Sequence, residues 1–406
     1  MINLDHNATT KPTPGVVRAV ERALVELWHN PSSVHRGGQA ARHAVELARA
    51  SVAALINAKP REVVFTSGGT EALDLAIRGR LESLAGARGE STDAAPLNIV
   101  TSPVEHHAIR DLCDHLAAGP GASRIEIRPA PVSREGEIDA IALSGLIDTN
   151  TALVVVQSAN NETGTIQPVE LICKRARMKG ARVLIDATQS VGKLPFDVRK
   201  DPSPDAVVFS PHKFHGPKGV GVLWLAPGFR VVPQVRGTQE LGRRGGTENV
   251  PGIVGAGIAA DEAREWLADP VRRQEIAGLR DRFEERVLAG VPGAVVNGPR
   301  DVAGVATDSA RRLWNTSNIG FPKLEAEALL LLLSERGVAA SAGAACSSGS
   351  LEPSPVLLAM GIDPEIAHGS LRFSLGRDTT REEVDQAAAI VVECVGVLSR
   401  SGNVRR

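Results

Sequence analysis

The segment VVFSPHKFHGPKGVGVLWL, residues 207–225, places a lysine between two histidines. Lys213 lies there between His212 and His215, and apolar runs typical of buried strands flank the group. A lysine shielded from water loses its proton readily, and its amine can then form a Schiff base with a carbonyl compound. The segment therefore predicts a reactive lysine, while His215 and Lys218 are expected to be solvated loop residues.

A second strand end offers a carboxylate. Asp186 ends the apolar run of VLIDATQS, where a buried carboxylate costs free energy unless it meets a cation or a metal ion. The alternative is a strand-end aspartate whose side chain caps a turn. Lys213 lies at the corresponding end of the next strand, which begins near Asp205, and this placement favours a functional pair.

A glycine turn follows the apolar run EVVF. Gly68, Gly69 and Thr70 lead from it into the helix-like segment TEALDLAIRGRLESL, and backbone N–H groups at the start of a helix suit a phosphate group. The turn has neither the lysine-containing phosphate-loop pattern nor the G-x-G-x-x-G of dinucleotide sites. The alternative is an ordinary turn in which Thr70 caps the helix.

These groups match the requirements of one cofactor. In pyridoxal phosphate enzymes a lysine holds the aldehyde of the cofactor and an aspartate pairs with the nitrogen of its ring. A turn that binds the phosphate and a flat side chain against the ring complete the minimum set. The sequence offers candidates for all four roles, with Lys213 and Asp186 as the first two.

Strand-like and helix-like segments alternate through the first two thirds of the chain, which predicts a mostly parallel α/β sheet with helices on both faces. Such sheets bind ligands at the carboxyl ends of their strands. Polar clusters fall at five such ends: Ser67–Thr70, Glu105–His106, Asn160–Glu162, Asp186–Gln189 and Ser210–Lys213. The alternation therefore predicts one shared site at this edge.

The 406 residues are enough for two domains that share a cleft. We expect a large cofactor-binding α/β domain over residues 15–262. Residues 1–14 and 263–406 are expected to form a smaller α+β domain, which carries a loop at 339–354 with Cys346. The four cysteines form no C-x-x-C pair, so neither a zinc site nor a disulfide framework is predicted.

Charge and hydropathy narrow the class of protein. The 46 basic and 47 acidic residues nearly cancel, which argues against direct nucleic-acid binding. No apolar stretch approaches the ~20 residues of a membrane-spanning helix. The N-terminal residues MINLDHNATT lack the basic and apolar regions of a signal peptide, so a cytoplasmic location is expected.

Ten motifs together resemble the cysteine desulfurases of the NifS/IscS type, within the class V aminotransferases and the fold-type I pyridoxal phosphate enzymes. They occur in order over essentially the whole length: LDHNATT, HNPSSVHRGGQAA, VVFTSGGTEALDLAI, VEHHAI, NNETGTIQP, DATQSVGKLP, SPHKFHGPKGVG, GRRGGTENV, GAACSSGSLEPS and HGSLRFSLGRDTT. The resemblance implies a seven-stranded type of sheet with helices on both faces and a smaller α+β domain.

The resemblance also implies residue roles. Lys213 would hold the cofactor, Asp186 would keep its ring nitrogen protonated, and His106 would stack on the ring and move protons. The ring hydroxyl would be contacted by Gln189 and Asn161. The phosphate would be bound by Gly69, Thr70, Ser210, His212 and, in a homodimer, Thr247 of the partner subunit. The substrate carboxylate would be held by Asn30, Asn161 and Arg372.

Cys346 would accept sulfur from L-cysteine as a persulfide, leaving L-alanine, and would pass the sulfur to an iron–sulfur scaffold or a thiolation relay. The alternatives are another class V enzyme, such as an aminotransferase or a selenocysteine lyase, and a catalytically idle binding protein on the same fold. The sequence departs from the family's glycine run at VRGTQELGRR, where Arg236 and Thr238 stand.

Overall fold

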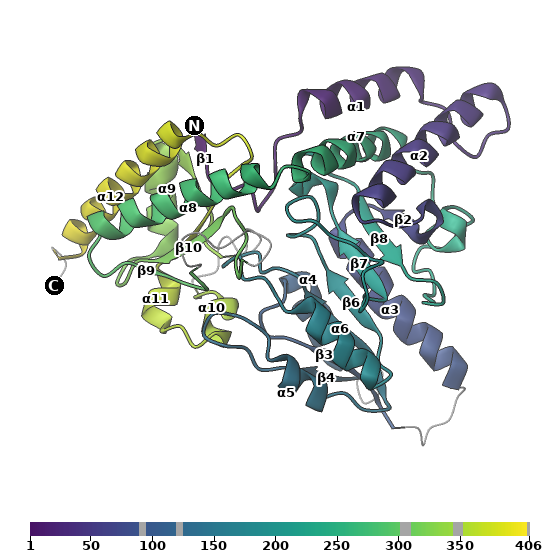
Figure 1. Cartoon of the computed structure of the whole chain (residues 1–406), viewed down its shortest axis with the longest axis horizontal. Helices are drawn as coiled ribbons and strands as arrows, with labels where there is room; N and C mark the ends of the chain where they lie inside the picture. Colours follow the sequence, from purple (N-terminus) through teal and green to yellow (C-terminus); the bar gives the residue numbers. More distant parts are fainter. Residues whose placement is uncertain (89–94, 119–124, 301–309, 344–351, 404–406) are drawn as a thin grey trace.

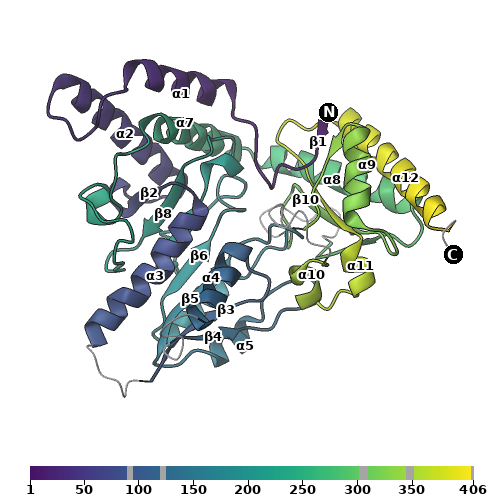
Figure 2. The ribbon, with the colours of Figure 1, turned by 180° about the vertical axis from the view of Figure 1, so that it is seen from behind.

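The structure is a computed structural model that describes residues 1–88, 95–118, 125–300, 310–343 and 352–403. Two lobes lie side by side in it (Figure 1). The larger lobe contains the main sheet, and the smaller lobe contains both the first strand and the last helix, as the view from behind also shows (Figure 2). Residues from both ends of the chain thus lie on one side of the site.

The larger lobe is built on a seven-stranded sheet. Its strands are β2 (Val63–Thr66), β3 (Leu97–Thr101), β4 (Ile125–Pro129), β5 (Thr151–Gln157), β6 (Val183–Asp186), β7 (Ala206–Phe209) and β8 (Gly221–Leu225). Their spatial order is β2-β8-β7-β6-β5-β3-β4; β8 is antiparallel to both neighbours, and every other pair is parallel. The predicted mostly parallel sheet is confirmed.

Helices cover both faces of this sheet, as predicted. One face packs against α2 (Arg36–Leu55), α5 (Ala140–Gly145), α6 (Val169–Met178) and α7 (Val250–Leu267), with α1 (Pro14–Glu26) on α7. The other face packs against α3 (Gly69–Arg88) and α4 (His107–Ala118).

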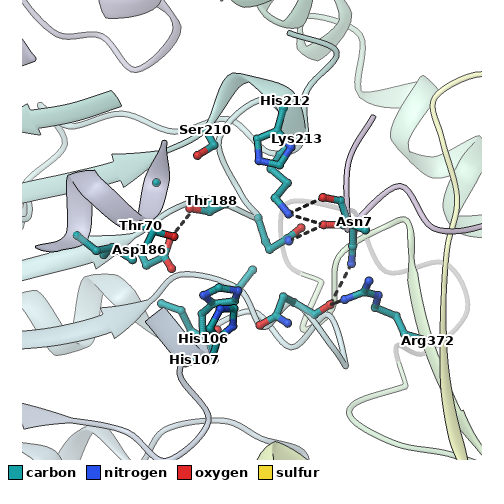
Figure 3. Close-up of a pocket in the computed structure, with 17 residues that line it drawn as sticks. Asn7, Thr70, His106, His107, Asp186, Thr188, Ser210, His212, Lys213 and Arg372 are labelled. Carbon is teal, nitrogen blue, oxygen red and sulfur yellow. Dashed lines mark hydrogen bonds between the residues drawn. The ribbon is translucent and has the colours of Figure 1, made fainter. Parts of the chain in front are cut away.

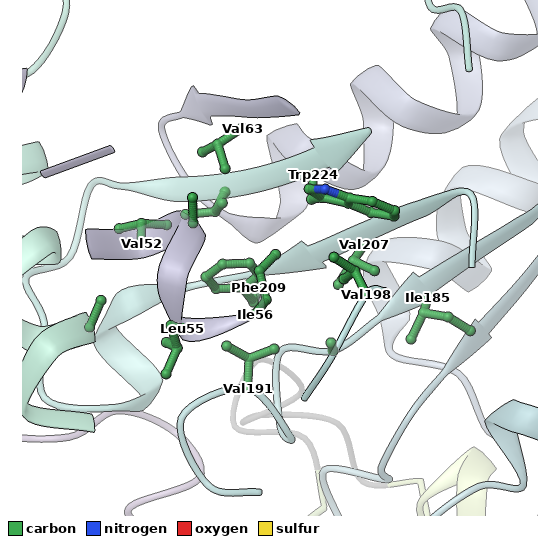
Figure 4. Packing of buried hydrophobic residues seen from close by; sticks show 14 of the residues in the cluster. Val52, Leu55, Ile56, Val63, Ile185, Val191, Val198, Val207, Phe209 and Trp224 are labelled. Carbon is green, nitrogen blue, oxygen red and sulfur yellow. The ribbon is translucent and has the colours of Figure 1, made fainter. Parts of the chain in front are cut away.

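The central strands are apolar throughout because both of their faces are buried. Side chains alternate between the faces of a strand, so Val207 and Phe209 of β7 join one hydrophobic cluster while Val208 joins the other. Figure 4 shows the first cluster, in which Phe209 lies against Ile56 at the end of α2. This packing fixes β7, the strand that leads into Ser210–Lys213.

The smaller lobe has its own sheet and core. Its antiparallel sheet has the order β12 (Ser370–Ser374), β10 (Thr316–Gly320), β9 (Val295–Val296), and β1 (Ile2–Asn3) pairs in parallel with β11 (Val338–Ala339). Its helices are α8 (Pro270–Gly290), α9 (Ala326–Glu335), α10 (Pro355–Ala359), α11 (Pro364–His368) and α12 (Arg381–Asn403).

One hydrophobic cluster joins Ile2 and Leu4 to residues from Trp266 onward. This cluster agrees with the proposed grouping of residues 1–14 and 263–406, which stays a prediction. Cys346 lies outside the described residues, whereas Cys113, Cys173 and Cys394 are buried. In the described part of the chain, no helix has the length and apolar character needed to cross a membrane.

Close packing of α2 on α7 depends on a glycine. A methyl group built on Gly257 would lie 2.7 Å from the Cα and Cβ atoms of Ala48, which is closer than carbon atoms pack. Gly278 in α8 is exposed and has no atom within 4 Å of such a methyl group. The same substitution should therefore have opposite effects at the two positions.

We predict that Gly257→Ala lowers the free energy of unfolding by about 1–3 kcal/mol, because the overpacked helices must move apart. Gly278→Ala should raise it by up to about 1 kcal/mol through helix propensity. Urea unfolding followed by circular dichroism measures both changes. Equal effects of the two substitutions would contradict this account of the α2–α7 contact.

Candidate active site

A cavity of about 240 Å³ opens at the carboxyl ends of the central strands, between the two lobes. All five polar clusters of the sequence contribute to it, together with the first residues of the chain and β12 (Figure 3). Its lining comprises Asn7, Ala8, Gly69, Thr70, Leu73, His106, His107, Gln157, Ala159, Asn161, Asp186, Thr188, Gln189, Ser210, His212, Lys213 and Arg372. The predicted shared site is thus present as a cavity.

Lys213 ends a short 3-10 helix, Pro211–Lys213, directly after β7. Thr10 fixes this turn, because its backbone N–H and its hydroxyl both donate to His212 O at 2.9 Å and its hydroxyl accepts from His215 N at 2.6 Å. Lys213 Nζ donates to two backbone carbonyls, Asn7 O at 2.8 Å and Ala8 O at 2.9 Å. The amine is thereby directed along the N-terminal segment at the edge of the cavity.

His215 does not fit its prediction as a solvated residue. Its ring is buried and its Nδ1 lies 2.9 Å from Lys11 O, so it helps to hold the N-terminal segment over the turn. Lys218 is exposed, as predicted. The sequence did not indicate this difference because Lys11 lies some 200 positions before His215.

The turn at Gly69 forms a small polar recess. α3 begins at Gly69, and a methyl group built there would lie 2.8 Å from Ser210 Oγ and 3.6 Å from Thr188 Oγ1. Only glycine leaves this space between β2 and β7 open. Backbone N–H groups at the start of a helix attract anions, so the recess suits a phosphate group.

His212 borders this recess. Its Nδ1 lies 3.2 Å from Thr9 Oγ1. Burial, together with the charges of Lys213 and Lys218, lowers the pKa of His212 to about 4. The imidazole is therefore neutral at pH 7, and one of its nitrogens is a hydrogen-bond donor.

Asp186 is buried at the end of β6, a central strand of the sheet. Its Oδ1 accepts a hydrogen bond from Thr188 N at 2.9 Å, and burial raises the pKa of its carboxyl group. A carboxylate in such a place is stabilised by a cationic or N–H partner. The sequence left open whether Asp186 caps a turn or binds a ligand. In this geometry its side chain can do both.

His106 lies against His107, with ring centroids 3.9 Å apart. His106 Nδ1 accepts a hydrogen bond from Ala108 N at 3.2 Å, so the proton of the neutral ring is on Nε2. Burial and the nearby charges of His107 and Lys213 lower the pKa of His106 to about 3. A neutral flat ring at the cavity suits stacking against an aromatic ligand.

Three buried polar atoms of the cavity lining lack partners within the described structure: His107 Nδ1, Asn161 Oδ1 and Arg372 Nε. Arg372 extends from β12 of the smaller lobe; it pairs with Asp5 Oδ1 at 2.8 Å and donates to Asn161 O at 3.0 Å. A buried unpaired donor beside a buried unpaired acceptor indicates a ligand that carries both kinds of group.

The sequence profile described as "Aminotransferase class-V" matches residues 2–387. The chain belongs to the class-V aminotransferase family. It is 43% identical over 396 residues to a cysteine desulfurase of Nostoc sp., covering 97% of this chain and 93% of that protein. Two solved structures are similar: "NifS-like protein" (33% identity, TM-score 0.86, 98% and 100% coverage) and "SspA in complex with cysteine" (30%, 0.75, 92% and 99%).

These findings confirm the resemblance and the fold class inferred from the motifs. Most of the residues that the class-V motifs pointed to lie in the cavity: Gly69, Thr70, His106, Asn161, Asp186, Gln189, Ser210, His212, Lys213 and Arg372. Two do not line it. Asn30 is exposed in the α1–α2 connection and accepts a hydrogen bond from Ser32 N at 2.8 Å, and Thr247 lines a separate cavity with Ser67 and Arg244.

Sequence reasoning gave no individual role to seven residues of the lining: Asn7, Ala8, Leu73, His107, Gln157, Ala159 and Thr188, the last of which lies within the predicted cluster Asp186–Gln189. A signal was present for two of them. Asn7 belongs to the motif LDHNATT, and Thr188 stands two positions after Asp186 in DATQ. The strand pattern carries no such signal for Gln157, which ends β5 as an apparently ordinary strand residue.

Glu105 lies directly before His106 and is completely buried. Its Oε1 lies 2.5 Å from Ser102 Oγ, and its Oε2 accepts from Gln157 N at 2.7 Å. Burial raises the pKa of Glu105 to about 8, because no cation lies in hydrogen-bond contact with it and the charged form is poorly solvated. Glu105 is therefore a neutral acid at pH 7.

Glu105 should make the stability of this class-V protein pH-dependent. An unfolded glutamate loses its proton near pH ~4.3, whereas folded Glu105 keeps it to about pH 8. The folded state therefore binds more protons between these values. The free energy of unfolding should fall there as the pH rises, by up to about 1.4 kcal/mol per pH unit from this group.

Glu105→Gln keeps the shape of the neutral acid and removes its titration. We expect the difference in the free energy of unfolding, variant minus wild type, to increase from pH 5 to pH 8. Urea unfolding at each pH measures this difference. Parallel stability curves over this range would show that Glu105 is ionised in the folded protein.

Proposed function

We propose that the protein is a pyridoxal phosphate-dependent cysteine desulfurase, which converts L-cysteine to L-alanine and transfers the sulfur to Cys346. One observation carries the proposal. Asp186 and Lys213, at the ends of the neighbouring strands β6 and β7, line one cavity with Arg372 of the smaller lobe, in a chain 43% identical to a cysteine desulfurase along nearly its whole length. The cysteine bound in the related SspA structure supports the choice of substrate.

The cavity fits the cofactor. The recess at Gly69 would hold the phosphate through Thr70, Ser210 and His212, since a side chain at Gly69 would fill it. Asp186 would pair with the ring nitrogen and His106 would stack on the ring. The unpaired Oδ1 of Asn161 and the amide of Gln189 supply polar contacts at the same cavity. When bound, the cofactor supplies an electron sink for the carbon atom that carries the substrate's amino group.

Lys213 would hold and move a proton at its Nζ atom. The carbonyls of Asn7 and Ala8 fix that nitrogen at the cavity, so it can remove a proton from the substrate and return it with little reorganisation. Arg372 would bind the substrate carboxylate through its unpaired Nε–H. Asp5 keeps this guanidinium in place from its other side.

The overall sulfur transfer balances without an added oxidant. The carbon–sulfur bond of L-cysteine breaks, a sulfur–sulfur bond to Cys346 forms, and the thiol proton is redistributed to give L-alanine and a Cys346 persulfide. The nucleophile is the thiolate of Cys346. Delivery to an iron–sulfur scaffold or to a thiolation relay would then regenerate the thiol.

The test compares alanine and sulfide release from L-cysteine, with a thiol reductant, in the wild type, Cys346→Ala and Lys213→Ala. Cys346→Ala should keep the bound cofactor and its visible absorbance while turnover falls to background. Lys213→Ala should lose the absorbance that depends on its covalent link. Cys394→Ala is the matched control, because that thiol is buried in α12 and does not line the cavity, and it should turn over normally.

If the wild type bound the cofactor but released no sulfide, the assignment of cysteine desulfurase activity would be wrong. Amino-group transfer to a keto acid, the alternative within class V, would then be tested. Full activity in Cys346→Ala would instead contradict the transfer of sulfur to Cys346 as a persulfide.

We further propose a homodimer in which Thr247 contacts the cofactor phosphate of the other subunit. Within its own chain Thr247 lies in a different cavity from Lys213. The end of α1 and the α1–α2 connection expose apolar side chains, with Val25, Trp28 and Val34 at 71%, 71% and 89% exposure. Apolar groups exposed to this degree in one region favour a protein contact.

Mixing Lys213→Ala chains with Thr247→Ala chains tests the shared site. One site of the mixed dimer would then contain both wild-type residues, so activity should return to as much as about a quarter of the wild-type level by random pairing. Each variant alone should be inactive or weakened in cofactor affinity. If activity did not recover in a mixture shown to exchange subunits, Thr247 would not act in the site of the other subunit.

A further inference from the structure

Lys193 is a buried lysine that the proposed reaction does not use. It follows β6 by seven positions, in DATQSVGK, and is 3% exposed. It does not line the cavity. The charges that act on it most are those of the cations Lys213, Arg372 and Arg377, and burying an ammonium group among cations is costly. The free-energy cost of burying this amine must be offset by hydrogen bonds.

The Nζ of Lys193 makes two short hydrogen bonds. It donates to Asn7 Oδ1 and to Gln189 Oε1, both at 2.6 Å. Lysine can only donate when charged, so these contacts decide which end of each amide group faces it. An amide orientation that is otherwise ambiguous is thereby fixed.

For Gln189 the orientation has a direct effect on the cavity. With Oε1 held by Lys193, the Nε2 group is on the side of Asn7 O, to which it donates at 3.1 Å. Nε2 carries two hydrogens, and Gln189 lines the cavity. Its second N–H is therefore available to a ligand in the cavity, which Asn7 and Lys213 also line (Figure 3).

Through Asn7, Lys193 also influences the position of Lys213. Asn7 Oδ1 accepts from Lys193 and from Asn315 Nδ2 at 3.0 Å, and this fixes the side chain. The backbone carbonyl of Asn7 accepts from both Lys213 Nζ at 2.8 Å and Gln189 Nε2. Lys193 is thus connected to the reactive amine through Asn7 alone and, by a second path, through Gln189 and Asn7.

We infer that Lys193 is a positioning residue, which turns the N–H side of Gln189 toward the ring oxygen of the cofactor and sets the carbonyl that holds Lys213. The inference rests on the proposed function, because it assumes a cofactor with a ring oxygen in this cavity. It assigns Lys193 no contact with substrate or cofactor.

The arrangement does not require a charged lysine. Burial and the neighbouring cations Lys213, Arg372 and Arg377 lower the pKa of Lys193 well below its usual value; His6 also lies close enough for Lys193 to affect its charge. A neutral amine still has two hydrogens for the two amide oxygens, and the amide nitrogens of Gln189 and Asn7 face the carbonyls of Asn7 and Asn161, which can only accept. The positioning should therefore persist whichever state Lys193 adopts.

Loss of Lys193 should make the bound cofactor more basic. A donor such as the Gln189 N–H stabilises a negatively charged ring oxygen and weakens its attraction for a proton shared with the Lys213 nitrogen. Without Lys193 the amide can turn its oxygen toward the cavity. The midpoint of the pH titration of the visible absorbance should then rise by about one pH unit, a tenfold change in the protonation equilibrium.

The experiment titrates the visible absorbance of cofactor-loaded wild type, Lys193→Met, Gln189→Leu and the double variant. Methionine keeps the length of the side chain and removes its donors. Both single variants should raise the midpoint, and the double variant should add little, because both act through one amide. Lys193→Arg keeps long donors and should restore a midpoint near the wild-type value, which a purely structural role would not require.

Lys200→Met is the matched control, since that lysine is exposed and paired with Glu170 on the surface; its midpoint should not move. If Lys193→Met were too unstable to bind the cofactor, the other two variants would still test the positioning role. Gln189→Leu must shift the midpoint, and Lys193→Arg must leave it unchanged.

Two outcomes separate the inference from the proposed function. A wild type with no pH-dependent cofactor absorbance would overturn the proposed cofactor and this inference with it. A normal wild-type titration with an unshifted midpoint in Lys193→Met, or additive shifts in the double variant, would overturn the positioning role alone.

Discussion

The hydrogen bonds of Asn7 are the contacts on which the rest of the site depends. Its backbone carbonyl accepts from Lys213 and Gln189 of the larger lobe. Its amide nitrogen donates to Asn161 O at 3.3 Å and to Thr316 Oγ1 of the smaller lobe at 2.9 Å. One residue near the start of the chain therefore ties both lobes to the reactive lysine. The pairing of β1 with β11 holds this segment in the smaller lobe, so the geometry of the cavity depends on how the lobes pack.

The electrostatics of the cavity follow from what the sheet buries there. Lys213 and Arg372 line it. Burial and nearby charges, among them that of Lys213, lower the pKa of His106 to about 3 and that of His212 to about 4. Neutral histidines limit the repulsion among groups that the fold has brought together. A site of this kind attracts a ligand with more than one negative group, such as a phosphate and a carboxylate, and it leaves Asp186 as the carboxylate at its base. The same balance explains why a second lysine, Lys193, can lie beneath the cavity only with amide oxygens around it.

The sequence predicted those features that arise from local pattern. The apolar strands and the polar groups at their ends predicted the sheet and the five polar clusters that line the cavity, since parallel strands bring their carboxyl ends to one edge; Arg372 was implied by the resemblance alone. The sequence could not predict contacts that depend on the relative position of the lobes. Asn7 and Lys193 lie 186 positions apart, and nothing in the alternation of strands and helices indicates that they meet. Asn30 was placed by motif alone; it is exposed in the α1–α2 connection and its role stays a prediction.

The carboxylates at the edge of the cavity connect substrate binding to the segment that carries the proposed sulfur acceptor. Asp5 pairs with Arg372 and also accepts from Ser341 Oγ at 2.8 Å, while Glu162 accepts from Ser354 Oγ at 2.6 Å and acts electrostatically on Arg372. Ser341 and Ser354 lie on either side of residues 344–351. Both described flanks of this segment are therefore bound to carboxylates that also act on one arginine. A substrate carboxylate at Arg372 would compete with Asp5 and Glu162 for its positive charge. Because the same carboxylates accept from Ser341 and Ser354, the charge state at Arg372 and the two described flanks of residues 344–351 are linked through Asp5 and Glu162.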